Sequence, residues 1–238
     1  ENHKRYGTPI LFDETDIATA QQFCEGIEYE KEIEVLPGVK AIWKDAGHIF
    51  GSAFIELTAD GKKIAFSGDI GNEGVPILKD TSKLSSDIDV LLCESTYGDR
   101  IHEAEDVRRE VILKLIKEGV AKGGTIMVPA FSLERTQEFL YELNKLAEYD
   151  EKLPDMPIFL DSPLAINATA VYKKYPKYYD EEAMRLHLVG DDFLDFPNLQ
   201  MTHTKEESKK INHVPGPKMI IAGSGMMNGG RIIHHAFR

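Results

Sequence analysis

The chain has 238 residues, of which 42% are hydrophobic and 29% are charged. These proportions are typical of a soluble globular protein and exclude a disordered chain, a collagen and a coiled coil. No run of about eighteen apolar residues predicts a membrane span. The net charge of −12 disfavours a protein that coats nucleic acid through bulk positive charge, and two cysteines favour a reducing, cytoplasmic location over a disulfide framework.

The first half of the chain predicts one short helix and then strands. Acidic residues from Asp13 onward are typical of a helix start, and Gly26 is a suitable end. A period of two in the apolar residues then predicts strands, joined in one place by a hairpin turn at Asp60-Gly61. These strands lie around residues 39–43, 54–57 and 63–66. Residues 71–86 predict a loop, and the apolar run 88–93 predicts a strand covered on both faces.

The second half alternates strands with amphipathic helices. The predicted strands are 125–129, 157–160 and 218–222, and the predicted helices are 106–122, 134–147, 163–174 and one that begins near Arg231. This alternation favours an α/β fold with a mostly parallel sheet flanked by helices. We place the boundary between a β-rich domain, residues 1–104, and this second domain, residues 105–238.

Three polar side chains follow successive predicted strands of the first domain. His48, Asp69 and Glu94 each come shortly after a strand and have small residues around them. Side chains at strand ends converge on one edge of a sheet, and imidazole with carboxylate suits zinc, manganese or iron. Taken singly, each residue is more often a turn former or a hydrogen-bonded polar residue than a metal ligand. Two ligands also fall short of the three that catalytic zinc usually takes, so spacing alone gives only weak support to a metal site.

Six blocks of the sequence, in order along the chain, resemble the metallo-β-lactamase superfamily and its β-CASP branch of RNA-processing ribonucleases, which includes RNase J and the nuclease subunit of the cleavage and polyadenylation complex. The blocks are DAGHIFGSA (45–53), FSGDIG (66–71), CESTYG (93–98), VPAFSLERTQE (128–138), FLDSPLA (159–165) and GSGMM with GGRIIHH (223–235). The resemblance implies part of a metallo-β-lactamase αββα sandwich in residues 1–104, followed by a β-CASP domain in residues 105–238 that is expected to be incomplete at its C-terminus.

The resemblance also assigns roles to the three polar residues. It implies that His48 ligates one of two Zn²⁺ ions, that Asp69 bridges both ions and is catalytic, and that Glu94 is an acid beside the metals that orients a histidine. The implied activity is hydrolysis of an RNA phosphodiester by a metal-activated hydroxide at the domain interface. The superfamily's His-x-His-x-Asp-His block is absent, so we expect the chain to be an internal piece of a longer enzyme, with the missing ligands upstream of Glu1 and beyond Arg238.

Four residues of the second domain are candidates for binding the RNA phosphates. Ser224 and Gly225 lie in a glycine-rich turn between a strand and a helix, where backbone N–H groups favour an anion. Arg231 and Arg135 lie near the starts of two helices and offer guanidinium forks for phosphate, although solvent-exposed arginines are an equally good interpretation. His234 and His235 are adjacent on a helix and point about 100° apart, so we expect one to pack and the other to be exposed.

Two further functions stay open beside the ribonuclease. One is a non-catalytic RNA-binding or scaffold member of the same fold, which a degraded upstream histidine block would indicate. The other is a metallo-hydrolase of small esters or thioesters, although a small substrate has no need of the long second domain. RNA is the expected partner, no membrane is expected, and a homodimer is left open.

Overall fold

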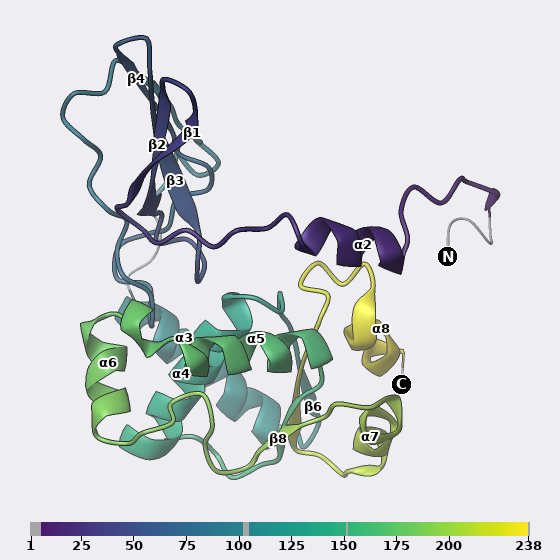
Figure 1. Cartoon of the computed structure of the whole chain (residues 1–238). Helices are drawn as coiled ribbons and strands as arrows, with labels where there is room; N and C mark the ends of the chain where they lie inside the picture. Colours follow the sequence, from purple (N-terminus) through teal and green to yellow (C-terminus); the bar gives the residue numbers. More distant parts are fainter. Residues whose placement is uncertain (1–5, 102–104, 151, 238) are drawn as a thin grey trace.

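The computed structural model describes residues 6–101, 105–150 and 152–237. In Figure 1 a first sheet stands at the upper left, above a larger unit of helices around a second sheet. The first sheet has the order β1-β2-β3-β4-β5. Its strands are β1 (Glu32–Leu36), β2 (Val39–Asp45), β3 (Ala53–Ala59), β4 (Lys62–Phe66) and β5 (Val90–Leu92).

The alternating pattern of the first half produces this sheet, as the sequence predicts. Asp60 and Gly61 both have positive φ, 50° and 71°, which a tight two-residue hairpin turn requires and which Gly adopts at little cost. β2 and β4 are each antiparallel to β3, and β5 is parallel to β4. Therefore β2, β4 and β5 run in the same direction, and their carboxyl ends lie at one edge of the sheet.

The prediction that strand 88–93 is covered on both faces is wrong for this chain. β5 is shorter than predicted, and Val90, Leu91 and Leu92 are each about half exposed. The physical reason is its place in the sheet, since β5 is the last strand in the order and pairs, among the described strands, with β4 alone. A continuous apolar run indicates that a strand is hydrophobic, but it does not indicate which helices or strands pack on its faces.

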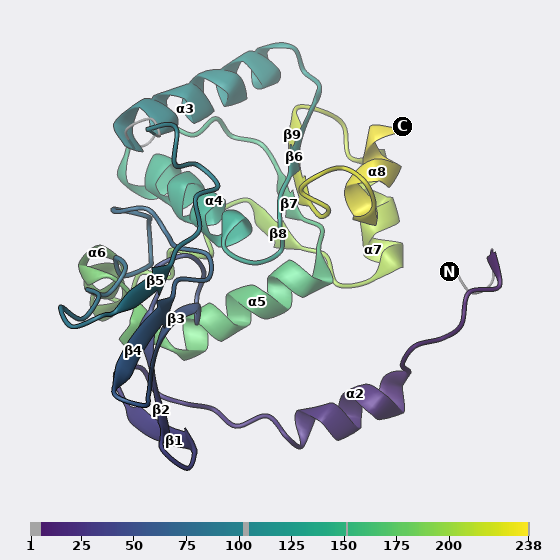
Figure 2. The ribbon, with the colours of Figure 1, turned by 90° about the horizontal axis from the view of Figure 1, so that it is seen from above.

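The second unit has a parallel sheet with the order β6-β9-β7-β8. Its strands are β6 (Thr125–Pro129), β7 (Ile158–Leu160), β8 (Leu199–Met201) and β9 (Lys218–Ala222), and its helices are α3 (Glu105–Ala121), α4 (Arg135–Asn144), α5 (Pro163–Lys174), α6 (Glu181–Leu188), α7 (Lys205–Lys210) and α8 (Gly230–Ala236). Figure 2 shows α3 and α4 on one side of this sheet and α7 and α8 on the other. The predicted α/β fold with a flanked parallel sheet is confirmed.

Two hydrophobic cores follow from the alternation of side chains along these strands. Ile158 and Leu160 of β7 face one core with residues of α3, α4 and α5. Phe159, between them in sequence, faces the other core with Ile211 and Ile232. Because successive side chains of a strand point to opposite faces, a run that is apolar throughout requires helices on both sides of the sheet.

Some elements of the second unit differ from the prediction. The helix expected over 134–147 is α4 followed by a π-helical turn from Lys145 to Tyr149. The short elements α6, α7 and β8 were not predicted. The predicted domain boundary between 104 and 105 falls next to residues 102–104, which lie outside the described residues, and it stays a prediction.

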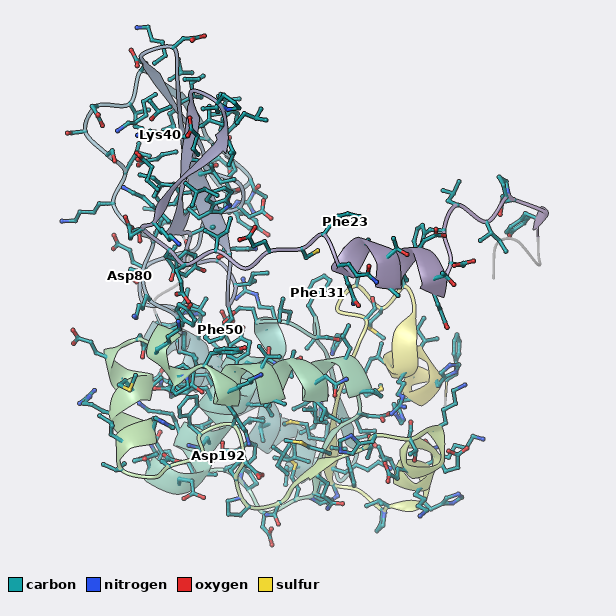
Figure 3. The ribbon with its side chains drawn as sticks, in the orientation of Figure 1. Phe23, Lys40, Phe50, Asp80, Phe131 and Asp192 are labelled. Atoms are coloured by element: carbon teal, nitrogen blue, oxygen red, sulfur yellow. The ribbon has the colours of Figure 1, made fainter. Side chains whose placement is uncertain are left out.

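The two units are joined by apolar side chains of the first that pack into the second. Phe50, labelled in Figure 3 at this junction, stacks on Tyr172 of α5 with ring centroids 4.2 Å apart. Ile77, in the predicted loop, is fully buried in the core of the second unit, and its carbonyl accepts the N–H of Asp180 at 2.8 Å. Ile77 has a φ of 75°, which is rare for a β-branched residue, so its tertiary contacts must hold it there.

The predicted N-terminal helix is α2 (Glu14–Gln21), which is capped by Asp13 and ends earlier than Gly26. All its residues are exposed, and it extends away from the first sheet (Figure 1). Over the described ranges 6–101, 105–150 and 152–237, no helix combines the length and apolar character needed to cross a membrane.

Candidate active site

The strand ends bring the three predicted polar residues of the first unit together. His48 follows β2, Asp69 follows β4 and Glu94 follows β5, and all three line one cavity of about 460 Å³. Nε2 of His48 lies 3.9 Å from Oδ2 of Asp69. The side chain of Asp69 is 76% exposed and that of His48 is 39% exposed, so both are open to a ligand in the cavity.

Glycines allow the turns that carry His48 and Asp69 to lie against each other. The N–H of Gly71 donates to the carbonyl of Ala46 at 2.9 Å. A Cβ at Gly71 would lie 1.6 Å from the carbonyl oxygen of Gly47, which no side chain could tolerate. Gly47 itself has a φ of 60°, in the left-handed region that favours glycine. The small residues beside His48 and Asp69 are therefore required by this close approach.

The carboxylate of Glu94 is committed to the turn that carries Asp69. Its Oε1 accepts the N–H of Ile70 at 2.6 Å, and its Oε2 accepts the N–H of Thr96 at 3.4 Å. The Ile70 and Thr96 donors, with a smaller contribution from His48, hold the pKa of Glu94 below its ordinary value, although burial acts in the opposite direction. Glu94 therefore stays ionised and fixes the backbone next to Asp69.

The cavity also has a basic wall. Arg100, Arg108 and Arg135 line it together with Glu138. Of the four predicted phosphate-binding residues, only Arg135 is among the described residues that line this cavity. Arg100 and Arg108 were not singled out in the sequence, because arginines at the end of a turn and on an ordinary helix face carry no recognisable pattern.

Residues 136–238 match the Beta-Casp domain. The chain is 35% identical to a ribonuclease of Thermus thermophilus over 94% of this chain and 51% of the relative, and 34% identical to an RNase J-like protein of Methanocaldococcus jannaschii over 94% and 52%. It is 30% identical to cleavage and polyadenylation specificity factor 73 of Drosophila melanogaster over 93% and 31%. The chain belongs to the metallo-β-lactamase β-CASP family. It spans about half the length of the first two relatives.

The two predicted metal ligands have the chemical type that a zinc site requires. Imidazole and carboxylate are zinc ligands with bonds of about 2 Å, so two donors 3.9 Å apart can reach one ion. Two ligands are too few for a complete zinc site, and no group of three or more His, Cys, Asp or Glu side chains that could hold a metal occurs among the described residues. His48 and Asp69 thus suit part of a metal site, and the two Zn²⁺ ions stay a prediction.

In the β-CASP domain, Arg231 is bound to a buried carboxylate. Asp161 is fully buried and accepts from Nη1 of Arg231 at 2.6 Å, and Nε2 of His235 lies 2.7 Å from its other oxygen. Burial acts to raise the pKa of Asp161, but these two donors, with Thr202 and Ser208, outweigh it and lower the pKa. The Asp161 cluster ties the end of β7 to α8. As predicted, one histidine of the pair is buried, His235, and His234 is exposed.

The glycine-rich turn that holds Ser224 and Gly225 is also internally bonded. Oγ of Ser224 lies 2.6 Å from Oδ1 of Asn228. A Cβ at Gly225 would lie 2.9 Å from the ring of Phe131, so close packing alone explains this glycine. Phosphate binding by Ser224, Gly225 and Arg231 stays a prediction, and at Arg231 an RNA phosphate would compete with Asp161.

A buried carboxyl that the sequence did not single out links the two units behind His48. Glu134 is 3% exposed, and its Oε2 accepts the N–H of Phe50 at 3.1 Å and the hydroxyl of Tyr172. Its Oε1 is buried and has no hydrogen-bond partner among the described residues. Burial raises the pKa of Glu134 to about 7, although the Tyr172 hydroxyl acts in the opposite direction. Glu134 has a φ of 65°, so the turn before α4 is held in a strained conformation.

Proposed function

We propose that the protein is a metal-dependent RNA phosphodiester hydrolase, with zinc as the metal, and that RNA binds in the cavity between the two domains. One observation carries the proposal: His48 and Asp69 line the same cavity as Arg135 of the β-CASP domain. Potential metal ligands and guanidinium groups in one cavity are what a phosphate diester requires. The relatives from Thermus thermophilus and Drosophila melanogaster are a ribonuclease and a cleavage and polyadenylation specificity factor, which supports RNA as the substrate.

The residues of this chain that line or support the cavity have different roles: metal binding, positioning of a turn and phosphate binding. His48 and Asp69 would hold the metal, which would supply Lewis-acid polarisation of the phosphate and a lowered pKa of bound water. Glu94 holds the backbone at Ile70 and so keeps the Asp69 turn in place. Arg135, whose guanidinium is 2.7 Å from Glu138 yet largely exposed, orients the phosphate in the same cavity.

The test uses the complete natural protein and a labelled single-stranded RNA. Removal of metal with a chelator abolishes cleavage, and added Zn²⁺ restores it. His48→Ala lowers both the bound metal and the cleavage rate, by about 10- to 100-fold or more, while His213→Ala, at an exposed histidine, leaves both unchanged. Cleavage that persists in the metal-free protein would refute the proposal, and rapid hydrolysis of small esters without RNA cleavage would favour the small-substrate hydrolase.

A cytoplasmic location is part of the same proposal. Both cysteines, Cys24 and Cys93, are free and exposed, as is usual in a reducing compartment. A homodimer stays a prediction, which the molecular mass in solution tests.

A further inference from the structure

The arginines of the basic wall and its surroundings outnumber the glutamates that are close enough to form ion pairs with them. Arg109 is held by Glu142, with Nε 2.6 Å from Oε2 and Nη2 3.3 Å from Oε1. Arg135 is held by Glu138 at 2.7 Å. Arg108 lies beside both of these glutamates in an adjoining cavity, and each is already paired with another arginine.

Arg108 consequently has an unmet hydrogen-bond donor. Within the part of the chain that the structure describes, its Nε is buried and has no hydrogen-bond partner. A buried donor without an acceptor is costly and uncommon. The side chain as a whole is partly exposed and also lines the cavity that contains His48 and Asp69, so an anion in this cavity can contact its guanidinium.

Arg100, on the same wall, has other partners. Its Nε lies 3.0 Å from Oδ1 of Asp99, and its guanidinium lies 5.7 Å from the centre of the Tyr97 ring. Of the three arginines on the wall, Arg108 alone has no ion pair among the described residues. The acceptor it suits is an anion with oxygens spaced for a guanidinium fork, which a phosphate provides and a neutral ligand does not.

We propose that Arg108 binds a phosphate of the RNA strand that lies in this cavity, in addition to the contact made by Arg135. This inference rests on the proposed function, because it takes the anion to be the RNA backbone. Arg108 is a binding residue: it holds the strand in the cavity that His48 and Asp69 also line, and it takes no part in the proton transfers.

Arg109 provides a matched control, because it is the next residue on α3. Neighbouring residues of a helix point about 100° apart, and Arg109 faces Glu142. Arg108→Gln and Arg109→Gln therefore remove the same charge from adjacent positions, one facing the cavity and one in an internal ion pair. Arg108→Lys keeps the charge and removes the fork.

The measurement is the dissociation constant for single-stranded RNA at several salt concentrations. It uses the complete natural protein with Asp69→Asn to prevent cleavage. We expect Arg108→Gln to weaken binding about 10-fold and to reduce the slope of log affinity against log salt by about 0.7, the value of one phosphate contact on a single strand. Arg108→Lys should weaken binding while keeping the slope, and Arg109→Gln should change neither affinity nor slope.

The result that overturns the inference is equal slopes for Arg108→Gln and the parent, or equal losses at Arg108 and Arg109. If the wild-type protein cleaves RNA in either case, the proposed function stands and only the role of Arg108 fails. If the wild-type protein neither binds nor cleaves RNA, both fail. Thermal unfolding of each variant separates a loss of binding from a loss of fold.

Discussion

The buried carboxyl of Glu134 should make stability depend on pH in a direction opposite to that of most acidic residues. Folding raises its pKa to about 7 from the ordinary value of 4.5, because burial favours the neutral form. The folded protein therefore binds this proton more tightly than the unfolded chain does. Stability from this group is fully present below about pH 4.5 and is lost as the pH rises through 7.

The size of the effect follows from the two pKa values. Linkage between a pKa of about 7 in the folded state and 4.5 in the unfolded state gives a loss of about 2.5 kcal/mol between pH 5 and pH 8. Glu134→Gln removes the titration and keeps an oxygen that can accept from Phe50 and Tyr172. On going from pH 5 to pH 8, the variant should therefore gain about 2.5 kcal/mol in unfolding free energy relative to the wild type.

The assay is urea unfolding of the complete natural protein and of Glu134→Gln at both pH values. Only the difference between the two proteins is used, so that the other titrating groups cancel. Tyr172→Phe removes a donor that holds the pKa of Glu134 down and should make the pH dependence steeper than in the wild type. Parallel loss of stability in the wild type and Glu134→Gln from pH 5 to pH 8 would refute this reasoning.

Two further predictions concern the Asp161 cluster and the contact between the turns. Asp161→Asn should cost about 3 kcal/mol at neutral pH, because it removes the fully buried carboxylate that pairs with the partly buried guanidinium of Arg231. Urea unfolding measures this cost, and a value below about 1 kcal/mol would contradict the prediction. Gly71→Ala should displace the His48 turn and lower the bound zinc, since its Cβ would overlap the carbonyl of Gly47. Metal analysis checks this against Gly26→Ala, where a Cβ meets nothing within 4 Å, and equal zinc in both variants would argue against it.

The elements that the sequence predicted well are those whose signals are local. Strands 125–129 and 218–222 and the helix 163–174 have the predicted bounds, because apolar runs and the cap formed by Ser162 with Pro163 define them. The elements α6, α7 and β8 are short, and their apolar residues are too few to show a period. Their positions depend on packing against the rest of the β-CASP domain.

The candidate site shows the same division between local and distant signals. The convergence of His48, Asp69 and Glu94 follows from strand direction, which the sequence pattern could predict. The different surroundings of Arg108 and Arg109 could not be predicted, because they depend on a glutamate more than thirty positions away, in α4. Likewise, nothing near Arg231 in sequence indicates Asp161, which lies 70 positions earlier.

The most direct test of the account is the rate of RNA cleavage by the zinc-replete, complete natural protein with Asp69→Asn. The substitution keeps the shape of a side chain that is open to the cavity and removes the charge that a metal requires. We predict a loss of more than about 100-fold with unchanged thermal unfolding. Cleavage of RNA at the wild-type rate by this variant would contradict the assignment of the His48–Asp69 cavity as the active site.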